Sequence, residues 1–400
     1  MGPGSPLHPM IAFSLALFTL AIWLTLVFAR GNFWQARETD DLLTPFEAGA
    51  APAPRVTAIM PARDEADVIA RSVTSLLGQN CGCAFDVVVV DDQSADGTAD
   101  VARRAAETIG AAHRLTVLRS EDPPPGWTGK LNAMRAGLAF VEKRPGDLPD
   151  YILFTDADIE HAPDVLARLV GGAERDGLAL VSLMAQLACV SRAERWLVPA
   201  FIYFFDMLYP FAWVNDPKRR AAAAAGGCML VRRAALHRAG GLDVIRDALI
   251  DDCALGAAMK RVGPIFLGLT SRVRSLRPYP HFSDIRRMVV RSAYTELRHS
   301  PLRLAGATLG MAVTFVAPPL LAGHPDPATG LAALAAYALM ALSYRPMLRR
   351  YRLRAWRALF LPAVALTYMV FTLESALAYA RGRGGAWKGR YQAAAESAGR

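Results

Sequence analysis

Several features that common protein classes require are scarce in this chain of 400 residues. The five cysteines, including Cys81 and Cys83, fit neither a dense disulfide framework nor the C-x₂-C pair of a zinc site. This cysteine usage favours a reducing compartment. Charged residues make up only 20% of the chain and hydrophobic residues 53%. This balance excludes intrinsic disorder and argues against an ordinary soluble globule.

Familiar nucleotide-binding and catalytic signatures are also missing. The sequence contains no G-x-G-x-x-G and no Walker lysine loop, which are the fingerprints of dinucleotide and P-loop sites. With only seven histidines, it offers no Ser-His-Asp or Cys-His arrangement. The 45 basic residues outnumber the 36 acidic ones, but they cluster beside apolar runs. That placement favours lipid headgroups over nucleic acid as the partner.

The excess of apolar residues is concentrated in a few long runs, the first of which is near the N-terminus. Met10 to Ala29 is twenty residues without charge, enough to cross a hydrocarbon core of about 30 Å. A cleaved signal peptide would have a basic start, whereas here Arg30 and Arg37 follow the run. We therefore predict a retained anchor at residues 1–30, then a linker at 31–54 on the cytoplasmic side.

Three further apolar runs predict a C-terminal transmembrane region at residues 301–380. They are Leu304–Gly323, Leu331–Tyr344 and Ala358–Ala380. The loop at 344–354 and the tail at 381–400 are both basic, as cytoplasmic segments are. Three complete spans would put the tail outside, so either the last run is re-entrant or interfacial, or the tail breaks the rule. The prediction is a multi-pass protein of the cytoplasmic (inner) membrane, with the intervening domain on the cytoplasmic side.

The stretch between the membrane segments, residues 55–300, alternates β-branched runs with alanine-rich runs. We predict helices at Asp64–Leu77 and Thr98–Ile109, and strands at Val56–Met60, Phe85–Val90, Leu115–Leu118 and Tyr151–Phe154. Strands that alternate with helices in this way predict βαβ units and an α/β, Rossmann-like fold with a mostly parallel sheet. Near residues 196–213, aromatic side chains with basic flanks predict an interfacial segment, with a buried core helix as the alternative.

Acidic residues follow three of the predicted strands. These strand ends read Pro61-Ala-Arg-Asp-Glu65, Asp91-Asp92 and Thr155-Asp-Ala-Asp158. Ligands of an open parallel sheet bind outside the carboxyl ends of its strands. Unpaired carboxylates brought together there would repel one another unless a cation or a ligand relieved the repulsion. Asp156 and Asp158 suit Mg²⁺ or Mn²⁺ shared with phosphate oxygens, although Asp158 could instead cap the next helix or close a turn.

These motifs, taken in order, resemble a known enzyme family. The segments Pro61–Ala66, Val90–Thr98 and Thr155–Asp158 resemble the signature of the inverting family 2 glycosyltransferases, which have the GT-A nucleotide-diphospho-sugar transferase fold. More narrowly, the chain is similar to the hopanoid-biosynthesis-associated membrane glycosyltransferases, relatives of the ceramide glucosyltransferases. That similarity is carried by Gly126–Lys130, Ala225–Leu230 and Arg277–Tyr279, and by the membrane segments at both ends.

The resemblance implies a role for each matching residue. Binding of the nucleotide-sugar donor falls to Pro61, Arg63, Glu65, Asp92, Lys130, Asp156 and Arg291. Among these, Glu65 and Asp92 would contact the base and ribose, and Lys130 would reach the diphosphate or the sugar. Asp158, with Asp156 beside it, would hold the divalent metal. Physical chemistry agrees, because carboxylates accept from imide and hydroxyl groups and an ammonium complements phosphate.

An inverting transfer also needs a general base for the acceptor hydroxyl. Asp251-Asp252 matches the acidic pair of the family, with Asp in place of the more usual Glu, and the resemblance makes Asp252 the base. The alternative is a pair of helix N-terminal aspartates favoured by the helix dipole. We expect His161 in the turn before the next helix, and a structural role for His281 rather than a third metal ligand.

One family motif is only partly retained. Of the Gln-x-x-Arg-Trp motif of processive relatives only Arg291 remains, which argues against a polysaccharide synthase. Arg291 would either clamp the diphosphate or belong to a basic interfacial helix.

We therefore predict a membrane-anchored enzyme that transfers one sugar from a nucleotide-sugar donor to a lipid acceptor with inversion. The alternatives are a polyprenyl-phosphate or carotenoid glycosyltransferase of the same fold, and a catalytically silent membrane scaffold. The intact Asp158 and Asp252 argue against the scaffold.

Overall fold

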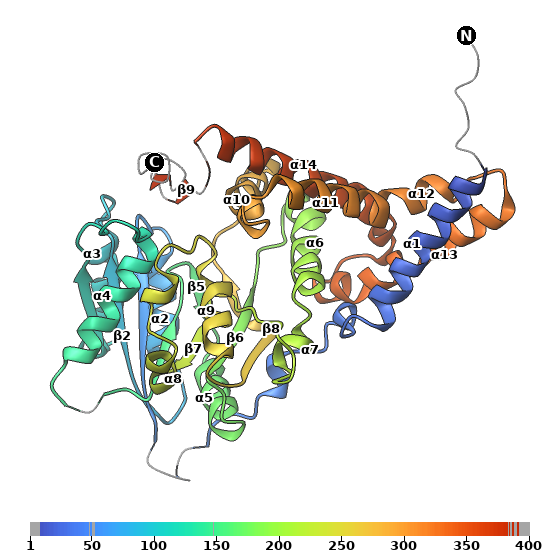
Figure 1. Ribbon diagram of the computed structural model, residues 1–400. Coiled ribbons are helices and arrows are strands. Elements are labelled where there is room, and N and C mark those ends of the chain that lie inside the picture. The colour runs from blue at the N-terminus through green and yellow to red at the C-terminus, as the bar shows by residue number, and fades with distance from the viewer. Residues whose placement is uncertain are drawn as a thin grey trace. The chain divides into compact units, whose positions relative to one another are not determined.

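The computed structural model divides the chain into two compact units (Figure 1). It describes residues 9–47, 49, 53–146, 148–382, 384, 386–387 and 390–391. The sheet unit comprises residues 38–188 and 211–278, and the helical unit takes in the described parts of 1–37, 189–210 and 279–400. Positions 48 and 50–52 of the predicted linker, the first eight residues of the predicted anchor and most of the predicted basic tail lie outside the described residues.

The sheet unit is built on one eight-stranded sheet with the order β3-β2-β1-β4-β7-β6-β8-β5. Strands β3, β2, β1 and β4 are mutually parallel, whereas β7 runs antiparallel to both β4 and β6. Strand β8 pairs parallel with β6 and antiparallel with β5. The predicted α/β fold with a parallel sheet is thus confirmed for its first half. The strands are β1 Arg55–Ala62, β2 Ala84–Asp91, β3 Leu115–Arg119, β4 Tyr151–Phe154, β5 Ile159–His161, β6 Leu180–Gln186, β7 Met229–Arg232 and β8 Ile265–Ser275.

Both faces of β1, β2 and β4 are largely buried, which explains their nearly continuous apolar runs. Ala58 and Met60 of β1 belong to the core that also contains apolar side chains of α2, α3 and α5, while Ile59 lies under α4. Helix α4 approaches closely because residue 137 is glycine: a Cβ there would lie 2.6 Å from Ile59 Cγ2. The helices of this unit are α2 Ile69–Leu77, α3 Thr98–Thr108, α4 Gly129–Lys143, α5 Val165–Arg175, α7 Phe211–Asn215, α8 Arg233–Arg238 and α9 Asp251–Lys260.

Two local predictions for this unit, the start of α2 and the place of His161, are wrong, and one alternative, Asp158 as a helix cap, is excluded. Helix α2 begins at Ile69 rather than at Asp64, since Asp64 has a positive φ of 50° and its N–H bonds to Ser94 Oγ instead. Asp158 does not cap the next helix, because β5 follows it and Asp164 precedes α5. His161 is the buried last residue of β5 and does not lie in a turn.

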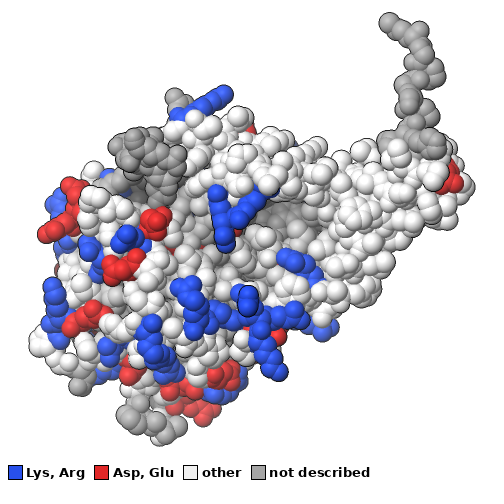
Figure 2. Space-filling model, viewed as in Figure 1, with Lys and Arg blue, Asp and Glu red and all other residues white. Residues whose placement is uncertain are grey.

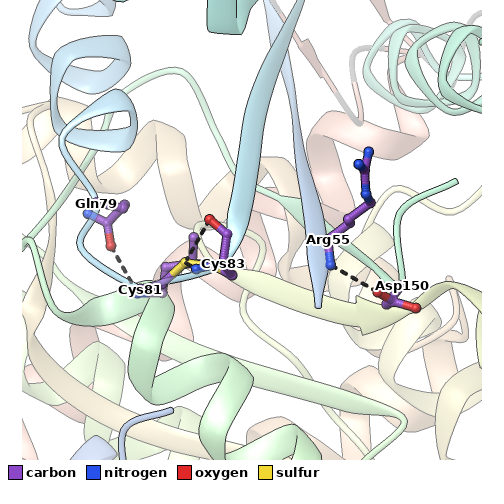
Figure 3. Close-up of a disulfide and its surroundings, with 6 residues drawn as sticks. Arg55, Gln79, Cys81, Cys83 and Asp150 are labelled. Carbon is purple, nitrogen blue, oxygen red and sulfur yellow. Dashed lines mark hydrogen bonds between the residues drawn. A yellow bond between two sulfur atoms is a disulfide. The ribbon is translucent and has the colours of Figure 1, made fainter. Parts of the chain in front are cut away.

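The loop between α2 and β2 contains a disulfide that joins Cys81 to Cys83 (Figure 3). Beside it, the Arg55 N–H at the start of β1 donates to Asp150 Oδ2 at 2.9 Å (Figure 3). The Cys81–Cys83 disulfide differs from what we expected, because the cysteine usage favoured a reducing compartment. Because it closes so short a loop, it restrains little of the unfolded chain. Cys189, Cys228 and Cys253 are free.

Part of the predicted linker is a folded portion of the sheet unit. Asp40 is buried, and its Oδ2 accepts from Thr270 Oγ1 at 2.7 Å and from Arg272 Nη1 at 3.0 Å. The Leu269 N–H donates to the Glu38 carbonyl at 2.8 Å. These contacts attach the segment that follows Arg37 to strand β8.

Among its described residues, the helical unit contains four helices that are long and apolar enough to cross a membrane: Pro9–Phe28, Pro301–Leu321, Pro327–Arg350 and Ala355–Ala380. They correspond to the four apolar runs of the sequence. On the visible face, α1, α12 and α13 carry few charged side chains (Figures 1 and 2). Many large apolar side chains are exposed on these helices, as lipid-facing surfaces require. The helices of this unit are α1 Pro9–Phe28, α6 Arg192–Leu208, α10 Phe282–Glu296, α11 Pro301–Met311, α12 Ala317–Leu321, α13 Pro327–Arg350 and α14 Leu361–Ala380.

Two polar groups in the apolar helices of this bundle illustrate how such groups find partners inside it. A π-helical turn, Ala312–Val316, joins α11 to α12, and its Thr314 carbonyl accepts the Trp23 indole N–H of α1 at 2.8 Å. Glu374, the one acidic residue of the last apolar run, accepts from Arg286 Nε of α10 at 2.6 Å. Backbone and side-chain polar groups in apolar surroundings need such partners.

The structure divides the aromatic segment at residues 196–213 between the two units. Helix α6 belongs to the helical unit, whereas α7 belongs to the sheet unit. Tyr203 of α6 is buried and its hydroxyl lies 2.7 Å from Ser343 Oγ of α13. The Tyr368 hydroxyl of α14 donates to the Leu197 carbonyl of α6 at 2.9 Å. Helix α6 therefore has the buried face of a core helix, which was the alternative to an interfacial segment.

Candidate active site

The loops after β1 and β2 are joined by hydrogen bonds at the carboxyl ends of these strands. Arg63 Nη1 donates to the Asp92 carbonyl at 2.8 Å and to Asp92 Oδ2 at 3.2 Å. Ser120 Oγ, after β3, donates to Asp92 Oδ1 at 3.1 Å. Asp92 is fully buried, and Pro61 lies within β1, opposite Val90 of β2. Asp92 and Arg63 thus form an ion pair between two strand ends.

The ends of β1 and β4 are joined by Arg277, from the segment after β8. Arg277 Nη2 pairs with Glu65 Oε2, and Arg277 Nε lies 3.1 Å from Asp158 Oδ2. Burial, and then the charge of Asp156, raise the pKa of Asp158, while Arg277 acts to lower it. The predicted convergence of Glu65 and Asp158 is therefore real, and a guanidinium balances part of their charge.

Lys130 joins the other aspartate of β4 to the start of α9. Its Nζ lies 2.9 Å from Asp156 Oδ1 and 3.1 Å from Asp251 Oδ2. Thr128 caps α4, since its Oγ1 accepts from the Leu131 N–H at 3.2 Å, and this cap places Lys130 in the first turn. Although burial acts to lower it, the pKa of Lys130 is raised well above its usual range by Asp156 and Asp251. The lysine is a permanent cation here.

Asp252 is held by two backbone N–H groups. Its Oδ2 accepts from Gly226 at 3.0 Å and its Oδ1 from Cys253 at 2.7 Å. Burial and the neighbouring Asp251 raise the pKa of Asp252 to about 6, against the opposing effect of Lys130. A carboxylate that titrates near neutral pH is well suited to accept a proton in catalysis.

Gly226 lies where Lys130, Asp156 and Asp252 converge. A Cβ at this position would lie 3.3 Å from Lys130 Nζ, 3.5 Å from Asp252 Oδ2 and 3.7 Å from Asp156 Oδ2. Any side chain here would enter the space between Asp252 and Asp156. The glycine therefore leaves a cradle that a ligand can fill.

The donor groups of this cradle fit a divalent cation shared with a ligand. Within the described part of the chain, no group of three or more His, Cys, Asp or Glu side chains could hold a metal without help. Asp156 Oδ2 would lie 3.7 Å from a Cβ at Gly226, and Asp158, two residues further along the chain, could supply a second hard carboxylate ligand. Mg²⁺ and Mn²⁺ take such ligands and complete their shells with water and phosphate oxygens.

Comparison with known proteins finds a protein family that the sequence of the sheet unit matches. Residues 57–240 match the model of Glycosyl transferase family 2. Over this segment the chain is similar to the family 2 glycosyltransferases.

Individual relatives agree with the match. The chain is 30% identical over 233 residues to an N-acetylglucosaminyltransferase of Rhizobium leguminosarum bv. viciae, covering 56% of this chain and 50% of the relative. It is 27% identical over 139 residues to an undecaprenyl-phosphate 4-deoxy-4-formamido-L-arabinose transferase of Salmonella paratyphi B, covering 34% and 38% of the two chains. The chain thus spans half or less of the length of these curated relatives.

A solved structure supports the same fold over nearly the whole chain. The mannosyltransferase PcManGT from Pyrobaculum calidifontis, in complex with GDP-Man and Mn²⁺, aligns with a TM-score of 0.51 and 22% identity. The alignment covers 92% of this chain and 98% of the mannosyltransferase. The predicted GT-A fold, with apolar helices toward both ends of the chain, is thereby confirmed.

Not every predicted residue falls in the candidate site at the strand ends. Arg291 is an exposed residue of α10 in the helical unit. His281 precedes α10, where its N–H donates to Asp284 Oδ2 at 2.9 Å. Burial lowers the pKa of His161 to about 3, so its imidazole is a neutral core group. The remaining predicted residues all lie in the sheet unit.

Two residues of the candidate site were not singled out in the sequence. Arg277 and Gly226 both occur in segments that carry the resemblance, but nothing local gives either one a role. The adjacent glycines at 226 and 227 were the available signal, since a paired glycine marks close approach of the backbone to something else. Arg277 offered no such signal, because its partners are 212 and 119 residues away.

Proposed function

We propose that this protein transfers one sugar from a nucleotide-diphosphate sugar to a lipid acceptor, with inversion at the anomeric carbon. The observation that carries the proposal is the placement of Asp252. Its carboxylate is fixed by the Gly226 N–H beside Lys130 and Asp156, at the carboxyl ends of the parallel strands. A base, a phosphate-binding cation and a metal-binding carboxylate thus surround one small cradle.

The donor would bind across the strand ends. Glu65 and Asp92 are assigned to the base and ribose, with Pro61 and Arg63 as part of that strand end. Lys130 is assigned to the diphosphate, because its ammonium is the cation beside the cradle. Asp156 and Asp158 would hold Mg²⁺ or Mn²⁺, which when bound neutralises charge on the departing diphosphate. Arg291 is retained as a second candidate for the diphosphate.

The transfer step follows from the position of the base. Asp252 takes the proton of the acceptor hydroxyl as the oxygen attacks the anomeric carbon and the bond from that carbon to the diphosphate breaks. Attack from the side opposite the leaving group inverts the configuration. Asp251 contacts Lys130 rather than the Gly226 N–H, so its role is to hold the lysine.

The acceptor is assigned to the lipid phase because four helices are long and apolar enough to cross a membrane. We place the sheet unit on the cytoplasmic side of the inner membrane, since Arg30 and Arg37 follow the first of these helices. The resemblance of the Gly126–Lys130 and Ala225–Leu230 segments further suggests a hydroxylated hopanoid-type lipid as the acceptor.

A polyprenyl phosphate is the second candidate for the acceptor. The similarity to an undecaprenyl-phosphate aminoarabinose transferase favours it. In that case the attacking group is a phosphate oxygen that is already ionised. The reaction would then not depend on a general base, so Asp252→Asn would retain activity.

The experiment uses the full chain in liposomes with Mn²⁺, a panel of UDP- and GDP-sugars, and either a hydroxylated hopanoid or undecaprenyl phosphate. We expect a glycosylated hopanoid, absent with Asp252→Asn and absent with EDTA. Sugar transfer to undecaprenyl phosphate alone would establish the second candidate. If no donor is turned over with any acceptor, the proposal is refuted, and a catalytically silent scaffold becomes the better interpretation.

A further inference from the structure

The two aspartates assigned to the metal are each already paired with a different basic side chain. Asp156 Oδ1 lies 2.9 Å from Lys130 Nζ, and Asp158 Oδ2 lies 3.1 Å from Arg277 Nε. A divalent cation that binds these oxygens must therefore compete with an ammonium and a guanidinium. Lys130 and Arg277 therefore balance the negative charge of the two aspartates that a metal ion would otherwise balance.

Both cations are also shared with a second carboxylate. Lys130 lies 3.1 Å from Asp251 Oδ2, and Arg277 pairs with Glu65. Their exposed fractions are small, 20% for the Lys130 side chain and 34% for that of Arg277. Neither cation can leave its aspartate for bulk water without uncovering a partly buried carboxylate, which is costly.

A diphosphate offers the displaced cations a new partner. Its oxygens accept charge-assisted hydrogen bonds from ammonium and guanidinium groups. The cradle at Gly226 keeps space free next to Lys130 Nζ, where a Cβ would lie 3.3 Å away. The lysine can therefore turn from Asp156 toward a ligand in the cradle without meeting a side chain at position 226.

We propose that Lys130 and Arg277 are exchangeable counter-cations of the metal site. They neutralise Asp156 and Asp158 in the empty enzyme, and they pass to the diphosphate when metal and nucleotide arrive together. The inference rests on the proposed function, since it takes these aspartates as the metal ligands. It makes the binding of metal and of nucleoside diphosphate mutually dependent, and by linkage each raises the affinity for the other by the same factor.

The test measures Mn²⁺ binding, without any sugar transfer. Free Mn²⁺ is followed by electron paramagnetic resonance at pH 7.5 as the full chain in detergent is titrated, with and without UDP or GDP. For the wild type we expect weak binding of Mn²⁺ alone and an affinity at least about tenfold higher with one of the nucleotides.

Removal of one internal cation should relieve the competition. We expect Lys130→Met to raise the affinity for Mn²⁺ alone about tenfold, and to shrink the factor by which nucleotide increases it. Arg277→Gln should act in the same direction through Asp158. The conservative Lys130→Arg, which keeps the charge, should behave as the wild type.

Matched controls are available on α4 itself and on β8, just before Arg277. Lys143→Met removes an exposed lysine at the other end of α4, and Arg274→Gln removes an exposed arginine of β8. Both should leave Mn²⁺ binding unchanged. If Lys130→Met does not fold, as judged by its melting temperature, Arg277→Gln carries the same test.

The proposal is overturned if folded Lys130→Met or Arg277→Gln binds Mn²⁺ no more tightly than the wild type. It is also overturned if nucleotide leaves the Mn²⁺ affinity of the wild type unchanged. Sugar transfer measured in parallel separates the two hypotheses. An inactive chain whose Mn²⁺ affinities change as expected refutes the proposed function alone, and an active chain with unchanged affinities refutes the exchange alone.

Discussion

Asp252 sits in surroundings that bring its titration close to neutral pH. Burial and the charge of Asp251 raise its pKa to about 6. A general base must be deprotonated, so we expect turnover to fall as the pH drops through about 6 and to level off above it.

Asp252→Asn should lower turnover about 10²–10⁴-fold and leave nucleotide affinity nearly unchanged. The measurements are a pH–rate profile and nucleotide titrations. An inactive Asp251→Asn beside an active Asp252→Asn would reverse the assignment.

Asp158 carries the prediction about the metal. Asp158→Asn keeps the shape of the side chain but removes a hard anionic ligand, so transfer should be lost while the fold is retained. Removal of the metal with EDTA should have the same effect on the wild type, and added Mn²⁺ should restore activity only there. Activity assays and thermal melting check both arms. Full activity in the variant would show that Asp158 does not hold the metal.

Gly226 tests whether the cradle is needed. In Gly226→Ala the new methyl group would lie 3.3 Å from Lys130 Nζ and 3.5 Å from Asp252 Oδ2. We expect a loss of at least about tenfold in kcat/KM with little change in melting temperature, because the methyl occupies ligand space rather than core. A variant as active as the wild type would mean that the ligand does not enter this space.

Helix α4 presents Lys130 from a position set by its packing on the sheet. Gly137 lets the helix approach Ile59 and Val90, to which a Cβ would lie 2.6 and 3.0 Å away. Gly137→Ala should therefore push α4 off the sheet and destabilise the protein by about 1–3 kcal/mol. Thermal unfolding in detergent measures this, with Gly306→Ala as the control, since a Cβ at that helical glycine meets nothing within 4 Å. Equal melting temperatures for the two variants would contradict this account of the packing.

At the scale of elements, the sequence predicted the strands and the start of α3 at Thr98, but not the start of α2. The runs at Val56–Met60 and Tyr151–Phe154 are buried strands, as their apolar residues indicated. Helix α2 began later than its periodicity suggested, because side chains of the loop after β2 take the first N–H groups. Glu65 donates its N–H to Thr98 Oγ1 at 2.9 Å, and Ala66 to Asp96 Oδ2 at 2.9 Å. Such competition comes from another part of the chain and is invisible locally.

For the whole molecule, the membrane topology is open to a direct test. If all four apolar helices cross, the loop at 322–326 and the C-terminal tail lie outside, and the loop at 351–354 lies inside with the sheet unit. Protease added to intact cells should leave residues 55–280 uncut, and single cysteines at 324 and in the tail should react with an impermeant reagent. Cleavage within residues 55–280 would show that the orientation in the membrane is the reverse of the predicted one. An unreactive tail would mean that the last helix does not cross.

The sequence by itself determined the apolar runs, the parallel strands and the acidic residues at their ends. These features depend on neighbouring residues, since strand burial and hydrocarbon thickness both leave a local pattern. Only the tertiary structure decided which charges meet. Asp156 pairs with Lys130, and Arg277 with Glu65 and Asp158, because β1, β4, β8 and α4 carry distant segments to one edge of the sheet. Helix α6 likewise lies among α13 and α14 through contacts that no local pattern encodes. The sequence shows the chemical nature of each charged or aromatic side chain, but tertiary packing determines which partner it contacts.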